Sequence, residues 1–187
     1  MSELVERLEK GEHGVGPGLW SMLVCVVGLA VVGVIGVLAK QPWVFPSLGP
    51  TLMVLAETPR QPAAHPLNVL AGHVVGVLCG YLALLLTGLV DHPAVLQEGL
   101  HAPRVVAACL SVGVTALLLQ CVGRPHPPAG ATTLIVSLGL FTTERSLLVL
   151  LVSVTVCTLV ATVLDRGLGL HQKGAAHRDR AGTTRSI

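Results

Sequence analysis

The chain has 187 residues, of which 52% are hydrophobic and only 12% are charged, and its formal net charge is +2. Soluble domains carry roughly a quarter charged residues, so a water-facing globule of this length is excluded. Disordered, disulfide-scaffold and nucleic-acid-binding classes are excluded as well, because the chain is apolar and has no basic patch interleaved with aromatic residues. A polytopic membrane protein remains.

Residues 1–17 form a tail that carries four glutamates ahead of the first apolar run. Leu4, Val5 and Leu8 lie among these charges, a pattern typical of a short helix on the membrane surface. A cleavable signal peptide has a short, positive leading region instead. We therefore expect the first apolar run to be a true membrane helix.

Four apolar runs are close to the roughly 20 residues that a spanning helix needs. They cover residues 18–39, 67–90, 104–122 and 146–164. Two shorter uncharged stretches, 41–56 and 125–143, are interrupted by Pro and Gly. These runs predict an all-α polytopic membrane protein with four spanning helices and two Pro/Gly-broken short helical segments. Residues 18–165 would form its transmembrane domain, and residues 166–187 a disordered basic tail.

An internal repeat relates positions that lie 81 residues apart. Gly49 and Thr51 superpose on Gly130 and Thr132, and each Gly-x-Thr opens an apolar run. The same offset places the second spanning helix on the fourth and matches small residues with small residues. These helix-packing candidates are Gly72, Gly76, Gly80, Ser153, Cys157 and Ala161. Small residues at every fourth position let helices approach closely in lipid, so we expect two copies of one unit, at about 18–90 and 103–165.

The two broken segments follow one plan, in which a cation precedes an extended Pro-rich run and a glycine then opens a short helix. Lys40 and Gly49 hold these places in the first copy, and Arg124 and Gly130 hold them in the second. The N-terminus of a helix leaves N–H groups unpaired and carries a partial positive charge, so it suits a small anion. Proline kinks that merely shape the bundle are the alternative.

Polar residues in and around these segments are the candidates for a substrate site. The substrate-binding candidates are Ser47, Gly49, Thr51, His73, Arg124, His126, Gly130 and Thr132. His73 would lie inside the second spanning helix, either lining a pore or accepting a proton; a neutral histidine bonded to a backbone carbonyl is the alternative. His126 would either donate to an anion or fix the Pro-rich loop. For Asn68 we favour a cap on the second helix over a contact with the loop.

The run His126-Pro127-Pro128-Ala-Gly-Ala-Thr, together with residues 46–51 and 65–68, resembles the HPP family of integral membrane proteins. The resemblance covers about residues 20–165. It implies a four-helix membrane domain and, because some members from cyanobacteria and chloroplasts are implicated in nitrite transport, nitrite as the leading substrate. The plasma membrane is the expected location, because no transit peptide is recognisable.

We therefore expect a transporter or channel for a small inorganic anion that lies in the lipid bilayer, with a homo-oligomer left open. The alternatives are a permease for a small neutral or cationic solute and a non-transporting membrane subunit. Since no catalytic, cofactor-binding, metal-ligand or nucleic-acid-binding pattern occurs, neither an enzyme nor a cofactor is expected.

The charge distribution predicts cytoplasmic positions for both termini. If the broken segments re-enter, the chain crosses four times and the repeats are parallel. If they cross, the chain crosses six times and the repeats are inverted. About seven extended residues followed by a nine-residue helix span roughly the hydrocarbon core, which favours crossing.

Overall fold

The computed structural model describes residues 2–170, and no strand occurs among them. Four of its helices are long and apolar enough to cross a membrane. These are α2 (Val15–Ala39), α4 (Pro66–Thr87), α6 (Ala102–Cys121) and α8 (Glu144–Leu168). The predicted all-α class with four spanning helices is confirmed, and each observed helix contains most or all of one predicted span.

Shorter helices fill the connections. They are α1 (Ser2–Lys10), α3 (Leu48–Glu57), the 3₁₀ turn η1 (Pro62–Ala64), α5 (Val95–Glu98) and α7 (Ala129–Ser137). The starts of α3 and α7 lie 81 residues apart, which is compatible with the proposed offset. The duplication itself stays a prediction.

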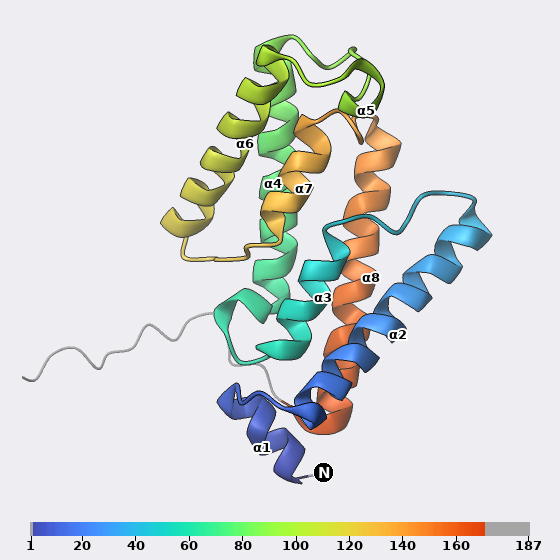
Figure 1. Cartoon of the computed structure of the whole chain (residues 1–187), viewed down its shortest axis with the longest axis vertical. Coiled ribbons are helices and arrows are strands. Elements are labelled where there is room, and N and C mark those ends of the chain that lie inside the picture. Colours follow the sequence, from blue (N-terminus) through green and yellow to red (C-terminus); the bar gives the residue numbers. More distant parts are fainter. Residues whose placement is uncertain (1, 171–187) are drawn as a thin grey trace, which may run out of the picture.

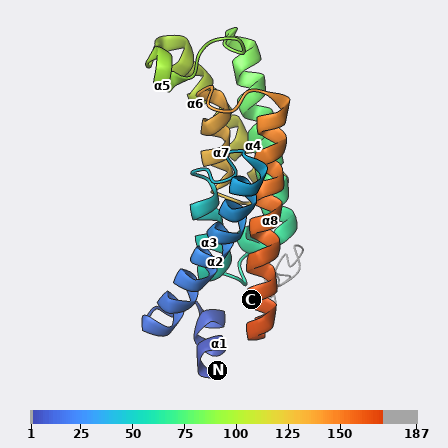
Figure 2. The same ribbon diagram turned by 90° about the vertical axis from the view of Figure 1, so that its right-hand side faces the viewer.

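The directions of the helices place the two halves of the chain in opposite orientations. In Figures 1 and 2, α2 and α4 both run upward, and α3 carries the chain back down between them. In the second half α6 and α8 run downward, and α7 runs upward between them. This arrangement favours the crossing alternative with inverted halves. It also places α1 and the end of α8 at the same end of the molecule.

The last helix of each half packs against the first two helices of the other half, an arrangement that we call the exchange of last helices. α4 packs against α6 and α7, which in turn pack against each other, while α8 packs against α2 and α3. A contact between α4 and α8 joins the two groups. Each group therefore contains elements of both halves of the chain, and α3 and α7 are enclosed by long helices.

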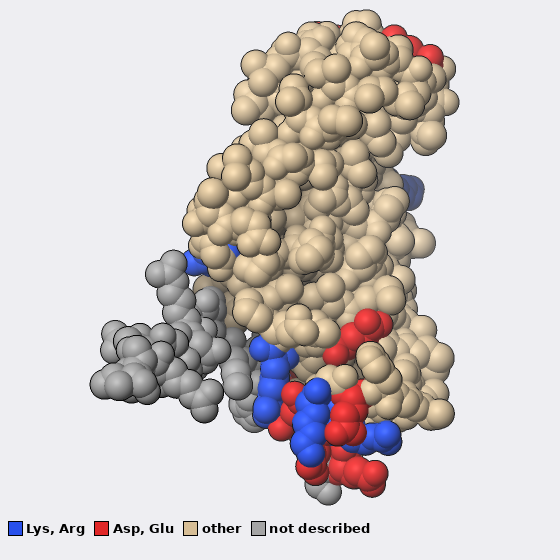
Figure 3. Space-filling view, turned by 60° about the vertical axis from the view of Figure 1, so that its left-hand side comes forward, with Lys and Arg blue, Asp and Glu red and all other residues tan. Residues whose placement is uncertain are grey.

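Charged side chains gather at the end of the molecule that carries α1, and the face shown in Figure 3 is otherwise almost free of them. Apolar side chains such as Val37 and Leu38 are exposed on α2. A broad uncharged belt of this kind suits the hydrocarbon core of a bilayer. At the charged end Glu9 of α1 forms an ion pair with Arg60, and Leu8 is buried.

Helix boundaries and one helix cap differ from the sequence-based expectation, and α2 begins at Val15, inside the predicted tail of residues 1–17. The last spanning helix continues past residue 164 to Leu168, because Asp165 is buried and its carboxylate accepts a hydrogen bond of 3.3 Å from Trp20 of α2. Residues 166–168, predicted to begin the tail, are thus helical, and the tail from residue 171 lies outside the described residues. Asn68 does not cap α4, so that prediction was wrong. The helix begins at Pro66 with His65 as its cap, and Asn68 Nδ2 donates instead to the Pro62 carbonyl over 2.8 Å.

Candidate functional site

The N-terminal ends of α3 and α7 meet in the interior of the molecule (Figure 1). Ser47 precedes α3, and Thr132 lies in the second turn of α7; both are fully buried. Their hydroxyl oxygens lie 2.8 Å apart. Residues 85 positions apart in the chain thereby join the two broken segments at their helix N-termini.

His73 bridges the two short helices from α4. Its Nδ1 atom lies 2.6 Å from the Thr132 hydroxyl, and its Nε2 atom lies 3.0 Å from the Thr51 hydroxyl of α3. The Thr51 hydroxyl also donates to the Ser47 carbonyl over 2.8 Å. Because His73 is fully buried, its ring nitrogens cannot form hydrogen bonds with bulk water. The two threonine hydroxyls provide these hydrogen bonds instead.

His126 completes the cluster from the loop before α7. Its Nε2 atom lies 3.2 Å from Nε2 of His73, and the two ring centroids are 5.0 Å apart. Its Nδ1 atom lies 2.8 Å from the Ala63 carbonyl oxygen. A carbonyl oxygen can only accept, so Nδ1 of His126 carries a hydrogen and donates it. The polar cluster defined by Ser47, Thr51, His73, His126 and Thr132 thus draws on α3, α4 and α7 and the loops that flank them.

A cavity of about 250 Å³ borders this polar cluster. Its walls come from the second half of α6, the loop before α7 and the first turn of α7. The polar lining side chains include Thr115, Gln120 and His126, and Gly130 contributes backbone at the start of α7. His126 therefore lies between the cavity and His73.

The remaining predicted binding residues lie outside the polar cluster. Gly49 and Gly130 belong to the first turns of α3 and α7, and a Cβ at either glycine would have no atom of another element within 4 Å among the described residues. The backbone N–H of Arg124 donates to the Leu119 carbonyl after the end of α6. Within residues 2–170 its side chain makes no hydrogen bond or ion pair, so a role for Arg124 in anion binding stays a prediction.

Gly72, Gly76 and Gly80 line the face of α4 that contacts α7 and the loop before it. A Cβ at Gly76 would lie 2.8 Å from the Ala129 carbonyl oxygen, and one at Gly80 would lie 2.8 Å from Val136. At Gly72 the nearest atom is Cβ of His126, at 2.9 Å. The absence of side chains on this face lets α4 approach α7 closely enough for His73 to reach Thr132.

The repeat-related residues of α8 are also fully buried. They are Ser153, Cys157 and Ala161. Cys157 lies against α2, with its Sγ atom 3.8 Å from the Gly28 carbonyl oxygen. In α2 it is Gly28 that provides the close approach, because a Cβ there would lie 2.7 Å from Leu52 of α3.

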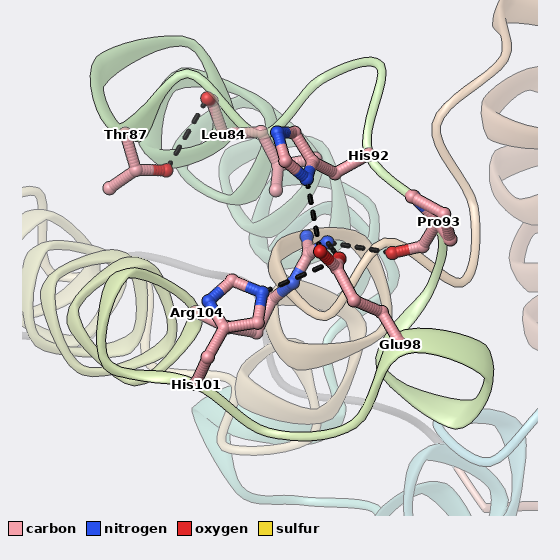
Figure 4. Close-up of polar contacts among 7 residues, drawn as sticks. All are labelled: Leu84, Thr87, His92, Pro93, Glu98, His101 and Arg104. Carbon is pink, nitrogen blue, oxygen red and sulfur yellow. Dashed lines mark hydrogen bonds and ion pairs between the residues drawn. The ribbon is translucent and has the colours of Figure 1, made fainter.

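A second polar cluster, which the sequence analysis did not identify, lies at the opposite end of the molecule from α1 (Figure 4). Arg104 of α6 is fully buried and donates to the Pro93 carbonyl over 2.8 Å. It also lies 3.6 Å from the Glu98 carboxylate, which accepts a hydrogen bond of 3.1 Å from His92. The hydrogen bond from His92 lowers the pKa of Glu98, and the neighbouring His101 acts in the same direction. The sequence did contain a signal for this cluster. Arg104 stands at the edge of a predicted span, and the connection before it carries His92, His101 and Glu98.

Comparison with known proteins identifies the family. The HPP transmembrane region matches residues 11–172. The chain belongs to the HPP transmembrane family. A transmembrane protein of Dictyostelium discoideum is 27% identical to the chain over 124 residues, which make up 64% of the chain and 40% of that protein. The chain thus spans less than half the length of this relative, and no solved structure matches it significantly. The HPP resemblance inferred from His126-Pro127-Pro128 is confirmed, and the chain is a multi-pass membrane protein.

Proposed function

We propose that this HPP protein is a transporter or channel for a small inorganic anion and not an enzyme. The observation that carries the proposal is the meeting of two short helices, α3 and α7, whose N-termini reach one buried polar cluster. Each N-terminus contributes roughly half a positive charge. In a bilayer such ends persist only where protein or a wet cavity surrounds them, and transporters with broken helices bind substrate in this arrangement.

The chemistry of the polar cluster supports an anion over a cation. Its side chains are hydroxyls and imidazoles, which can donate hydrogen bonds. Within residues 2–170, no carboxylate makes a hydrogen bond with Ser47, Thr51, His73, His126 or Thr132. The bordering cavity of about 250 Å³ suits a small solute. Nitrite is the leading substrate because of what is implied for other HPP members.

The charge pattern supports an orientation with both termini in the cytoplasm, and we propose the plasma membrane as the location. The end of the molecule that carries α1 and the end of α8 also carries most of the charged side chains visible in Figure 3. Cytoplasmic loops of membrane proteins are enriched in Lys and Arg. Lipid is the expected surrounding, and association of two copies is left open.

Reconstitution into lipid vesicles tests the proposal. Purified protein in vesicles is assayed for uptake of nitrite, nitrate and formate, with protein-free vesicles as the background. We expect protein-dependent flux that prefers anions over a neutral solute such as glycerol. Flux without anion selectivity would favour the neutral-solute permease, and absence of flux for all three anions would favour a non-transporting subunit.

A pair of threonine variants ties the flux to the polar cluster. Thr132→Val removes the hydroxyl that lies near both His73 and Ser47. Because one hydrogen bond contributes about 0.5–1.5 kcal/mol, nitrite flux should fall by roughly 2- to 12-fold. Thr155→Val is the matched control, since in the described part of the chain its hydroxyl bonds only to the Leu151 carbonyl of its own helix. Equal nitrite flux in Thr132→Val and Thr155→Val would show that the polar cluster is not involved in transport.

A further inference from the structure

The histidine pair admits two protonation states with the same positions of nitrogen and oxygen atoms. His126 donates from Nδ1 to the Ala63 carbonyl in either state, because that oxygen can only accept. In the neutral pair Nε2 of His126 is therefore an acceptor, and His73 donates to it from Nε2 over 3.2 Å. Nδ1 of His73 then accepts the hydroxyl hydrogen of Thr132 over 2.6 Å, and Thr132 no longer donates that hydrogen to the Ser47 hydroxyl.

One added proton fits without moving these atoms. It forms an N–H bond at Nδ1 of His73, which then donates to the Thr132 oxygen, and the Thr132 hydroxyl turns toward Ser47. The hydrogen between the two Nε2 atoms stays on His73, because the Thr51 hydroxyl donates to the Ser47 carbonyl and can only accept from the same Nε2. A second proton would place two N–H groups against each other across 3.2 Å and two like charges on adjacent rings. The capacity of the pair is therefore one proton.

Among the described residues, no side chain supplies a charge that would balance this proton. The partners of the pair are the Thr51 hydroxyl from α3, the Thr132 hydroxyl from α7 and the Ala63 carbonyl from η1. On α4, a Cβ added at Gly72 would lie 3.2 Å from Cδ2 of the His126 ring. Within residues 2–170, no Asp, Glu, Lys or Arg side chain bonds to either histidine, so each ring faces the other as its titratable neighbour.

An unbalanced positive charge at this place is costly for two reasons. It is buried, and a buried charge needs a partner of opposite sign. It also lies beside the first two turns of α3 and α7, whose N-termini are themselves partly positive. An anion at the same helix ends would offset both contributions, so the proton and the anion stabilise each other.

We propose that the His73–His126 pair takes up one proton together with the transported anion, so that transport is a one-to-one, electroneutral symport. This inference rests on the proposed function of anion transport and adds the proton as the second substrate. The cavity that His126 lines lies among α6, α7 and the loop before α7, and the pair would exchange its proton through it. The proton neither forms nor breaks a covalent bond of the anion.

The test separates the two driving forces in vesicles that contain the parent protein. Valinomycin and equal potassium concentrations inside and outside the vesicles hold the membrane potential at zero. The pH of the outer solution is then set one unit below the pH inside. Symport should accumulate nitrite about tenfold at equilibrium, because one pH unit corresponds to a factor of ten for one proton. A potential of about 59 mV without a pH gradient, equivalent to tenfold for one charge, should produce no accumulation. Protein-free vesicles give the background from diffusion of nitrous acid, and initial rates are compared after its subtraction.

Histidine variants assign the proton. His126→Asn removes the second imidazole and should abolish protein-dependent uptake driven by the pH gradient, whereas His13→Gln, an exposed histidine of the tail before α2, should behave as the parent. The parent measurement stands without the variant if His126→Asn fails to fold. Nitrite flux that follows the potential but not the pH gradient would overturn proton coupling and leave anion transport standing. Absence of nitrite flux under both gradients would overturn the proposed function, and this inference with it.

Discussion

Adding one methyl group to α4 at Gly76 should weaken the contact that positions His73. In Gly76→Ala the new Cβ would lie 2.8 Å from the Ala129 carbonyl oxygen and 2.9 Å from the Thr133 hydroxyl. Ordinary van der Waals contact begins near 3.4 Å, so α7 must move away by about 0.6 Å. The Thr133 hydroxyl donates to that same carbonyl, which leaves little freedom to relax locally. Overpacking of this size costs about 1–3 kcal/mol.

Helix propensity acts in the opposite direction, because alanine favours a helix over glycine by about 1 kcal/mol. Gly113→Ala on α6 measures that contribution alone, since no atom lies within 4 Å of its Cβ position. Thermal unfolding in detergent should place Gly76→Ala below Gly113→Ala by roughly 2–12 °C, at about 2–4 °C per kcal/mol for this length. Equal melting temperatures would show that the glycine face of α4 is not a tight contact.

Three further outcomes are expected. Arg124→Gln should reduce nitrite flux a few-fold in 0.01 M salt but not in 0.15 M salt. The Arg124 side chain makes no hydrogen bond or ion pair with the described residues, so it acts through its long-range field, whose Debye length shrinks from about 30 to 8 Å. An equal loss at both salts would contradict this. Arg104→Met removes the charged donor to the Pro93 carbonyl and should lower the free energy of unfolding by about 1.5–3 kcal/mol, measured by denaturation in mixed micelles. An unchanged free energy of unfolding would mean that the buried arginine does not contribute to stability. The His92 hydrogen bond holds the pKa of Glu98 below its ordinary value of 4.5. Its contribution to stability is therefore present above pH 4.5 and is lost as the pH falls through the lowered folded-state value. Proteolysis of the connection between α4 and α6 should rise over that range in the parent but not in Glu98→Gln.

The sequence was sufficient for the features that local chemistry determines. Apolar runs without charge predicted the four long helices, and the Pro-rich runs that end at Gly49 and Gly130 predicted the starts of α3 and α7 to within one residue of Leu48 and Ala129. Glycine at every fourth position of α4 predicted a face of close approach, and Gly72, Gly76 and Gly80 lie at such a face. Each of these signals is contained within a stretch of about 25 residues.

The sequence was insufficient where distant segments meet. Nothing in the spacing of His73 and His126 indicates that their rings lie 5.0 Å apart, because that distance depends on the packing of α4 against α7. Asn68 was misassigned for a related reason, since the η1 turn that occupies its side chain could not be foreseen. Arg104 looked like a residue at the edge of a span, yet the connection before α6 folds over it.

The exchange of last helices between the halves has a consequence for synthesis. When a ribosome has completed only α2, α3 and α4, the partners α6 and α7 that cover the glycine face of α4 do not yet exist. His73, on the same nascent helix, then lacks the Thr132 hydroxyl and the second imidazole. In the first half alone His73 keeps only the Thr51 hydroxyl of α3 among these partners. We therefore expect the two halves to complete their interiors together, after the second half has been inserted.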